Sequence, residues 1–170
     1  LSIIIMLLNF GIVTLLGGAV ASVLVAARLK GDKKLDETKF NGHLIIAGWN
    51  SFMRSTLKLI EDDLDSNPVV ILINETDQEL ISRSISGFDR LEIIHLSENY
   101  TKEPVLKKAF IEKCNTFMIV PDESALLPNE TPDEDKTVLT ALTAKSISND
   151  IQVVAQILDY EYISHLKRAN

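Results

Sequence analysis

The chain has 170 residues, of which 46% are hydrophobic, and its formal net charge is −7. This length allows one ordinary domain with some residues left over. A single cysteine, Cys114, excludes an intrachain disulfide scaffold, and the lack of paired cysteines excludes the usual zinc sites. The acidic balance argues against a nucleic-acid partner, because nucleic-acid-binding proteins need a basic face.

Residues 1–27 include no charged side chain. As a helix they would extend about 40 Å at ~1.5 Å per residue, which exceeds the roughly 30 Å hydrocarbon core of a bilayer. A signal peptide would begin with basic residues and have a shorter apolar segment, so we predict one transmembrane α-helix over residues 1–30. Four basic residues lie at its end: Arg28, Lys30, Lys33 and Lys34. By the positive-inside rule, everything after residue 30 then lies on the cytoplasmic side of the cell membrane.

The predicted span contains closely spaced small residues. Gly17 and Gly18 lie four positions before Ala21 and Ser22, a spacing that allows helices to approach closely. The same glycines could instead form a flexible point at which a pore-lining helix bends, and the span alone leaves both interpretations open. Residues 31–41 are polar and charged and form a predicted linker. Because the chain begins with a leucine, we expect it to be a fragment of a longer protein.

Beyond the linker, short apolar runs alternate with helical patterns. Near-continuous apolar strands separated by helices predict a parallel sheet covered on both faces, which is a doubly wound, Rossmann-like α/β domain over residues 42–170. Because the pattern stops at a helix, we expect one further strand beyond it. The predicted strands are 43–47, 69–73, 91–95, 116–120 and 151–157, and the predicted helices are 51–64, 77–85, 103–110, 133–147 and 159–168.

The turn after the first predicted strand is a candidate ligand site. It contains Gly48, Trp49, Asn50 and Ser51, and only Gly48 matches the three glycines of the dinucleotide-binding fingerprint. Asn50 and Met53 occupy the other two glycine positions. The following helix would still direct backbone N–H groups toward an anion from Asn50 and Ser51.

Two other loops supply candidate polar groups. Asn74 and Glu75 follow the second predicted strand, where a ribose-binding acid is expected, although this position also suits a helix-capping segment. Asp122 follows the fourth predicted strand and is either a ligand contact or a turn residue. The histidines are scattered, no catalytic constellation appears, and the acidic clusters lack the spacing of a calcium loop. We therefore expect no enzymatic activity, and the sequence leaves metal sites undefined.

The chain is arranged as an apolar span with glycines, then a short charged linker, then a strand ending in Gly-Trp. It resembles the inner pore helix and RCK (regulator of potassium conductance) N-lobe of prokaryotic ligand-gated potassium channels. The matching segments cover nearly the whole chain: IIIMLLNFGIVTLLGGAVASVL, GHLIIAGWN, VVILINE, FMIVPDE, DEDKTVLTALTAK and IQVVAQI.

The resemblance implies a homo-tetrameric channel that conducts potassium ions through a lipid bilayer and whose RCK lobes assemble into a gating ring. Ligand binding to the ring would pull on the inner helices through the linker, with Gly17 or Gly18 as the hinge. Gly48, Asn50 and Asn74 or Glu75 would form the cleft for NAD or another adenine nucleotide. Calcium is a further possible ligand, although the carboxylates that calcium-gated relatives carry at the fifth strand are Gln156 and Leu158 here.

Two alternatives remain at this stage. A membrane-anchored nucleotide-dependent oxidoreductase would need a substrate domain and a proton-transfer group, and neither is recognisable. A regulatory subunit of a potassium transporter is the other, but such subunits are usually soluble, which conflicts with the predicted span. A potassium-selectivity loop upstream of Leu1 would decide for the channel.

Overall fold

The structure is a computed structural model that describes residues 40–63, 68–124, 126, 130–159, 162, 163 and 167. The predicted transmembrane helix with Gly17 and Gly18, nearly all of the predicted linker and most of the last predicted helix lie outside these residues. Among the residues described, no helix combines the length and apolar character needed to cross a bilayer.

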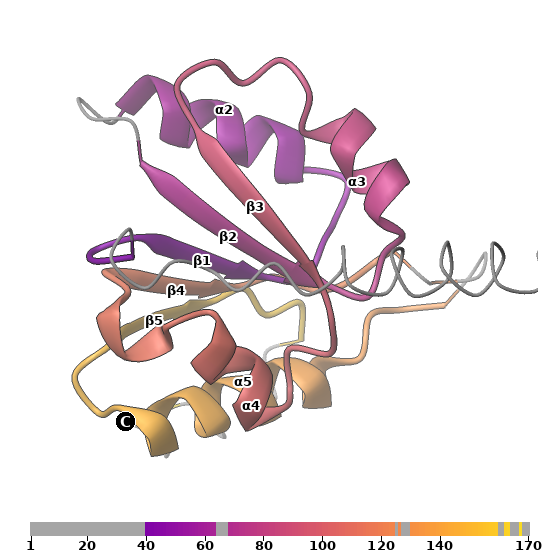
Figure 1. The fold of residues 1–170 in the computed structure, drawn as a ribbon. Helices are drawn as coiled ribbons and strands as arrows, with labels where there is room; N and C mark the ends of the chain where they lie inside the picture. The colour runs from indigo at the N-terminus through magenta and orange to yellow at the C-terminus, as the bar shows by residue number, and fades with distance from the viewer. Residues whose placement is uncertain are drawn as a thin grey trace, which may run out of the picture. The chain divides into compact units, whose positions relative to one another are not determined.

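The described residues form a five-stranded parallel sheet (Figure 1). Its strand order is β3-β2-β1-β4-β5, and every neighbouring pair runs parallel. The chain therefore builds outward from β1 in one direction and then returns to add β4 on the other side. This order confirms the predicted Rossmann-like α/β fold. The strands are β1 (Leu44–Ala47), β2 (Val69–Asn74), β3 (Glu92–Ser97), β4 (Thr116–Ile119) and β5 (Gln152–Ala155).

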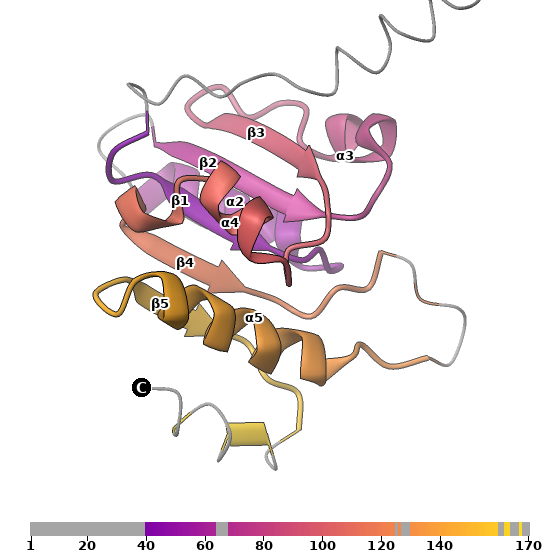
Figure 2. The ribbon, with the colours of Figure 1, turned by 60° about the horizontal axis from the view of Figure 1, so that its bottom comes forward.

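Helices cover both faces of the sheet, as the doubly wound prediction requires. Figures 1 and 2 show α2 and α3 on one face and α4 and α5 on the other. Each of these helices starts and ends within one or two residues of its predicted bounds, and a short 3₁₀ helix, η2, follows α4. The helices are α2 (Met53–Asp63), α3 (Gln78–Ser84), α4 (Glu103–Lys108) and α5 (Glu134–Ile147), and η2 spans Ile111–Lys113.

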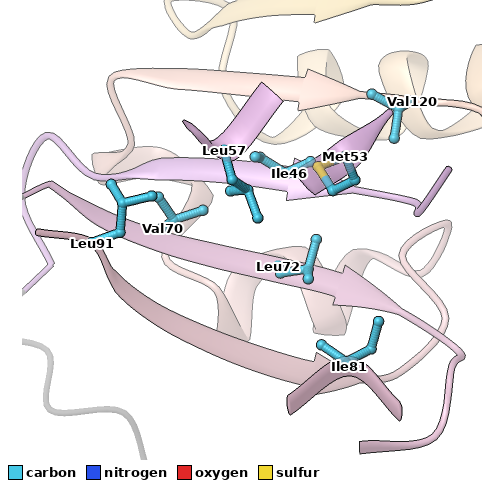
Figure 3. Close-up of a cluster of buried hydrophobic side chains, with 8 residues drawn as sticks. All are labelled: Ile46, Met53, Leu57, Val70, Leu72, Ile81, Leu91 and Val120. Carbon is cyan, nitrogen blue, oxygen red and sulfur yellow. The ribbon is translucent and has the colours of Figure 1, made fainter. Parts of the chain in front are cut away.

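The core on the α2 side of the sheet is a cluster of eight buried apolar side chains (Figure 3). Successive residues of a strand point to opposite faces, so Ile46 faces this cluster whereas Ile45 faces the α4 and α5 side. Both are fully buried. Burial on both faces explains why β1 and β2 are apolar runs without alternation. The cluster consists of Ile46, Met53, Leu57, Val70, Leu72, Ile81, Leu91 and Val120.

An aromatic group fixes the chain where it enters the sheet. Phe40 is only 2% exposed. Its ring stacks on Phe110 with centroids 5.3 Å apart and meets the edge of His43 at 5.4 Å. His43 in turn donates from Nε2 to the carbonyl oxygen of Ala109 at 2.9 Å. The end of the predicted linker is thus anchored to the turn that follows α4.

Candidate functional site

Gly48 lies at the point where the strand order reverses, between the ends of β2 and β4. Its φ of +93° is left-handed, a conformation that side-chain-bearing residues rarely adopt. Its N–H donates to the carbonyl oxygen of Ile73 at 2.8 Å. A Cβ at this position would collide with the carbonyl oxygen of Val120. The position therefore requires glycine, because the turn after β1 packs directly against the backbone of Val120.

Asn50, which replaces the second fingerprint glycine, binds within the protein. It is 5% exposed. Its Oδ1 accepts from the N–H of Phe52 at 3.1 Å, which caps the start of α2, and its Nδ2 donates to Gln156 Oε1 at 3.3 Å. Trp49 is partly buried against the α2-side core. The role of Asn50 and Trp49 in ligand binding stays a prediction.

The amino end of α2 already holds a carboxylate. The N–H of Ser51 donates to Oε2 of Glu123 at 2.9 Å, and both residues are exposed. The backbone N–H of Glu123 also donates to the carbonyl oxygen of Trp49 at 2.7 Å. A helix amino end favours negative charge because its N–H groups and its dipole both point at the anion. The sequence singled out Asp122 in this loop and missed Glu123; the only available signal was a second acid beside Asp122 at the sheet's carboxyl end.

Asp122 itself forms a local turn, since its Oδ1 accepts from the N–H of Ser124 at 3.1 Å and from the hydroxyl of the same residue. Its carboxylate also acts on Tyr100, which is 2% exposed. The pKa of Tyr100 is raised above its ordinary value, first by burial and then by Asp122, Glu75 and Asp133. Carboxylates from the β2–α3 loop, the β4–α5 loop and the cap of α5 thus all act on one buried phenol, and Glu75, Asp122 and Asp133 are together called the acidic rim.

At the end of β2, Asn74 and Glu75 differ in their exposure. Asn74 is fully buried, and its Oδ1 accepts from the N–H of Thr76 at 3.0 Å and from His95 Nε2 at 3.0 Å. Glu75 is half exposed and forms a 3.4 Å ion pair with Lys136 in the first turn of α5. Of the two predicted residues, Glu75 is therefore the one that a ligand could reach directly.

Three buried polar atoms near Asn74 have no hydrogen-bond partner among the described residues: Asn74 Nδ2, Thr76 Oγ1 and His95 Nδ1. Burial lowers the pKa of His95, and the nearby Asp77 carboxylate partly opposes that shift. A neutral His95 that donates from Nε2 leaves Nδ1 as an acceptor. His95 on β3 therefore contributes an uncharged polar group next to Asn74 at the end of β2.

Glu134, in the first turn of α5, is buried. Its carboxylate accepts from the backbone N–H groups of Leu158 and Asp159, the latter at 2.9 Å. The first turn of α5 is thereby tied to the segment after β5. Within the described part of the chain, no group of three or more His, Cys, Asp or Glu side chains is placed to hold a metal ion.

Comparison with protein families matches residues 44–170 to the TrkA-N domain. The chain belongs to the TrkA-N domain family. This finding confirms the RCK-type resemblance seen in the sequence, and it covers the whole described sheet. The switch point at Gly48 and the acidic rim thus lie within the TrkA-N domain of this chain.

Among curated proteins, this TrkA-N chain is similar to the calcium-gated potassium channel TvoK of Thermoplasma volcanium, with 26% identity over 165 residues. The alignment covers 96% of this chain and 44% of that protein. The chain therefore spans less than half the length of this curated relative.

Solved structures share the fold at low sequence identity. The NAD-bound GsuK channel superposes with a TM-score of 0.60 at 12% identity, over 80% of this chain and 21% of that one. The ADP-bound GsuK gives 0.56 at 12% identity, over 76% and 30%. The human SLO3 gating ring gives 0.51 at 14% identity, over 74% and 21%. These likenesses establish the fold of the TrkA-N domain described here.

Proposed function

We propose that this chain is the ligand-sensing, non-enzymatic gating part of a homo-tetrameric potassium channel. Residues 1–30 would form the pore-lining helix in the cell membrane, and the TrkA-N domain would lie in the cytoplasm as part of a ring. The observation that carries the proposal is the alignment with TvoK. It covers 96% of this chain, so most of the predicted pore helix is aligned with a potassium channel together with the domain.

The proposed ligand is an adenine nucleotide, such as ADP or NAD, bound at the carboxyl end of the sheet. Gly48 lies at the strand reversal, where doubly wound sheets bind their ligands, and its lack of a Cβ lets the turn after β1 pack against the Val120 carbonyl. The Ser51 N–H at the start of α2 suits a phosphate oxygen, because it already binds a carboxylate oxygen. The half-exposed Glu75 is positioned at the end of β2 for ribose hydroxyls. Related structures described as bound to NAD and to ADP support this choice.

Gating would follow from differential affinity. A ligand can shift the pore only if it binds one ring conformation more tightly than the other. The link to the pore would run through residues 31–41, which include the buried Phe40. Gly17 or Gly18 would serve as the bending point of the pore helix. This assignment needs no catalytic group, because ligand binding alone would shift the ring from one conformation to the other.

The full-length protein in potassium-loaded liposomes tests the proposal. We expect potassium flux that changes when ADP or NAD is added on the side of the domain, and no change with the pyrimidine nucleotide CDP. Calcium is tested in parallel as the alternative trigger. The absence of potassium flux under every condition would contradict the channel assignment. Turnover of NADH with an added substrate would instead favour the membrane-anchored oxidoreductase.

A further inference from the structure

We propose that Glu123 is an internal competitor for the phosphate position of the cleft. Its carboxylate occupies the amino end of α2, and a ligand phosphate must displace it in order to bind there. This inference rests on the proposed function, because it assumes that the cleft accepts adenine nucleotides. It adds a residue that sets the preference between charged and uncharged adenine ligands.

The geometry places Glu123 across the switch point of the sheet. Its side chain accepts from the N–H of Ser51 at 2.9 Å, and its backbone N–H donates to the carbonyl oxygen of Trp49 at 2.7 Å. The loop after β4 is thus bonded twice to the turn after β1, at the two residues that flank Asn50. The backbone bond can persist when the carboxylate leaves. The side-chain bond is exposed to solvent, so an incoming anion can reach and replace it.

The surrounding charges make that replacement costly for an anionic ligand. Glu75, Asp122 and Asp133 lie close enough to act together on Tyr100. Lys136 is the cation that pairs with Glu75 at the rim. A displaced Glu123 would therefore remain among carboxylates and next to the ligand phosphate, where like charges repel. Adenosine has no phosphate and would leave the Glu123–Ser51 bond intact.

Displacement also has a structural consequence. Glu123 belongs to the segment that leads from β4 to α5, and α5 begins at Glu134. Loss of the hydrogen bond between Ser51 and Glu123 removes a side-chain contact between this segment and the start of α2. Phosphate binding would thus release a contact of the β4–α5 loop, whereas adenosine binding would leave that contact in place.

The test compares ADP with adenosine by isothermal titration calorimetry on the whole chain in detergent. In the Glu123→Ala variant we expect ADP to bind about five- to tenfold more tightly than in the natural chain, with adenosine affinity changed less than about twofold. Glu123→Gln removes the charge but keeps an acceptor, so its gain for ADP should be intermediate. Glu112→Gln is the matched control, because it removes the same charge from exposed η2 without touching the cleft.

The amide resonance of Ser51 supplies a second measurement. In the natural chain it should shift when ADP is added, because the acceptor of its hydrogen bond changes from the Glu123 carboxylate to a phosphate oxygen, and it should not shift with adenosine. An unchanged ratio of ADP to adenosine affinity in Glu123→Ala would overturn the competitor role while leaving nucleotide binding in place. Failure of both adenosine and ADP to bind any variant would instead overturn the proposed ligand, and the competitor role with it.

Discussion

Gly48 combines two constraints that can be separated experimentally. Its φ of +93° is strained for other residues, and a Cβ would strike the carbonyl oxygen of Val120. Gly42 has a similar φ of +75°, but a Cβ there meets nothing within 4 Å. The difference between the two positions is therefore the collision with the backbone of the β4–α5 loop.

We predict that Gly48→Ala lowers the free energy of unfolding by about 3 kcal/mol or more, because the loop must move as well as the turn. Gly42→Ala should cost only about 1 kcal/mol, the cost of the backbone conformation. Urea denaturation followed by circular dichroism measures both. Equal losses would show that the Val120 contact is not a constraint.

Two histidines, the buried His43 and the partly buried His95, make stability depend on pH. Burial lowers the pKa of His43, whose Nδ1 has no partner among the described residues, and burial also lowers the pKa of His95. The unfolded chain then takes up protons at a higher pH than the folded chain. The free energy of unfolding should therefore have its full value above about pH 6.5. It should decrease as the pH falls toward the lower pKa values of the folded state.

Denaturation curves at pH 7.5 and at pH values stepping below about 6.5 check this prediction. The decrease should become smaller in His43→Gln and smaller again when His95→Gln is added, because each substitution removes one titrating group. A decrease of the same size in the double variant would assign the pH dependence to other groups.

Among the elements, the turn between α4 and η2 is held in an unusual conformation. Phe110 has a φ of +53° although it carries a large side chain. Its ring stacks on Phe40, and the N–H of Gly42 donates to the carbonyl oxygen of Lys113 at 2.8 Å. The contacts with residues 40–42 therefore stabilise a backbone that would otherwise be strained. This element lies at the amino end of the sheet, opposite to the cleft.

We predict that Phe40→Ala lowers the free energy of unfolding by about 3 kcal/mol, because a buried aromatic ring is removed. Phe40→Leu should cost less, since most of the volume remains. Phe52 is 69% exposed, and Phe52→Ala should change stability by no more than about 0.5 kcal/mol. Thermal or urea unfolding distinguishes the three variants, and a small effect of Phe40→Ala would mean that the linker is not anchored there.

At the scale of the whole molecule, charge opposes the proposed ligand. The chain has a net charge of −7, and the rim of the cleft concentrates the carboxylates of Glu75, Asp122 and Asp133. An anionic nucleotide therefore approaches a negative surface, in contrast to the basic faces of proteins whose anion binding weakens with salt.

We predict that the affinity for ADP rises when the salt concentration increases from about 20 to about 200 mM, because screening weakens the repulsion. The affinity for adenosine should stay the same. Calorimetric titrations at the two salt concentrations measure the effect. A decrease of ADP affinity with salt would show that attraction by Lys136 or another base outweighs the acidic rim.

Local sequence patterns were sufficient to predict the order and type of the elements. Continuous apolar runs such as VVILI predict buried strands, and the helical spacing of Met53, Leu57 and Ile60 predicts a helix with one buried face. Both patterns are local, because they depend only on which neighbouring side chains are buried. The same patterns determined the parallel sheet and placed the candidate cleft after β1, because a doubly wound fold has its ligand site at the strand reversal.

Which polar groups meet depends on how the whole chain folds. Ser51 and Glu123 are 72 residues apart, Asn50 and Gln156 are 106 apart, and Glu75 and Lys136 are 61 apart. Local sequence patterns do not encode such pairs, because the partners are brought together by the packing of whole strands and helices. For the same reason, the sequence could propose Asn74 and Glu75 equally, whereas folding buried Asn74 against His95 and left Glu75 at the rim.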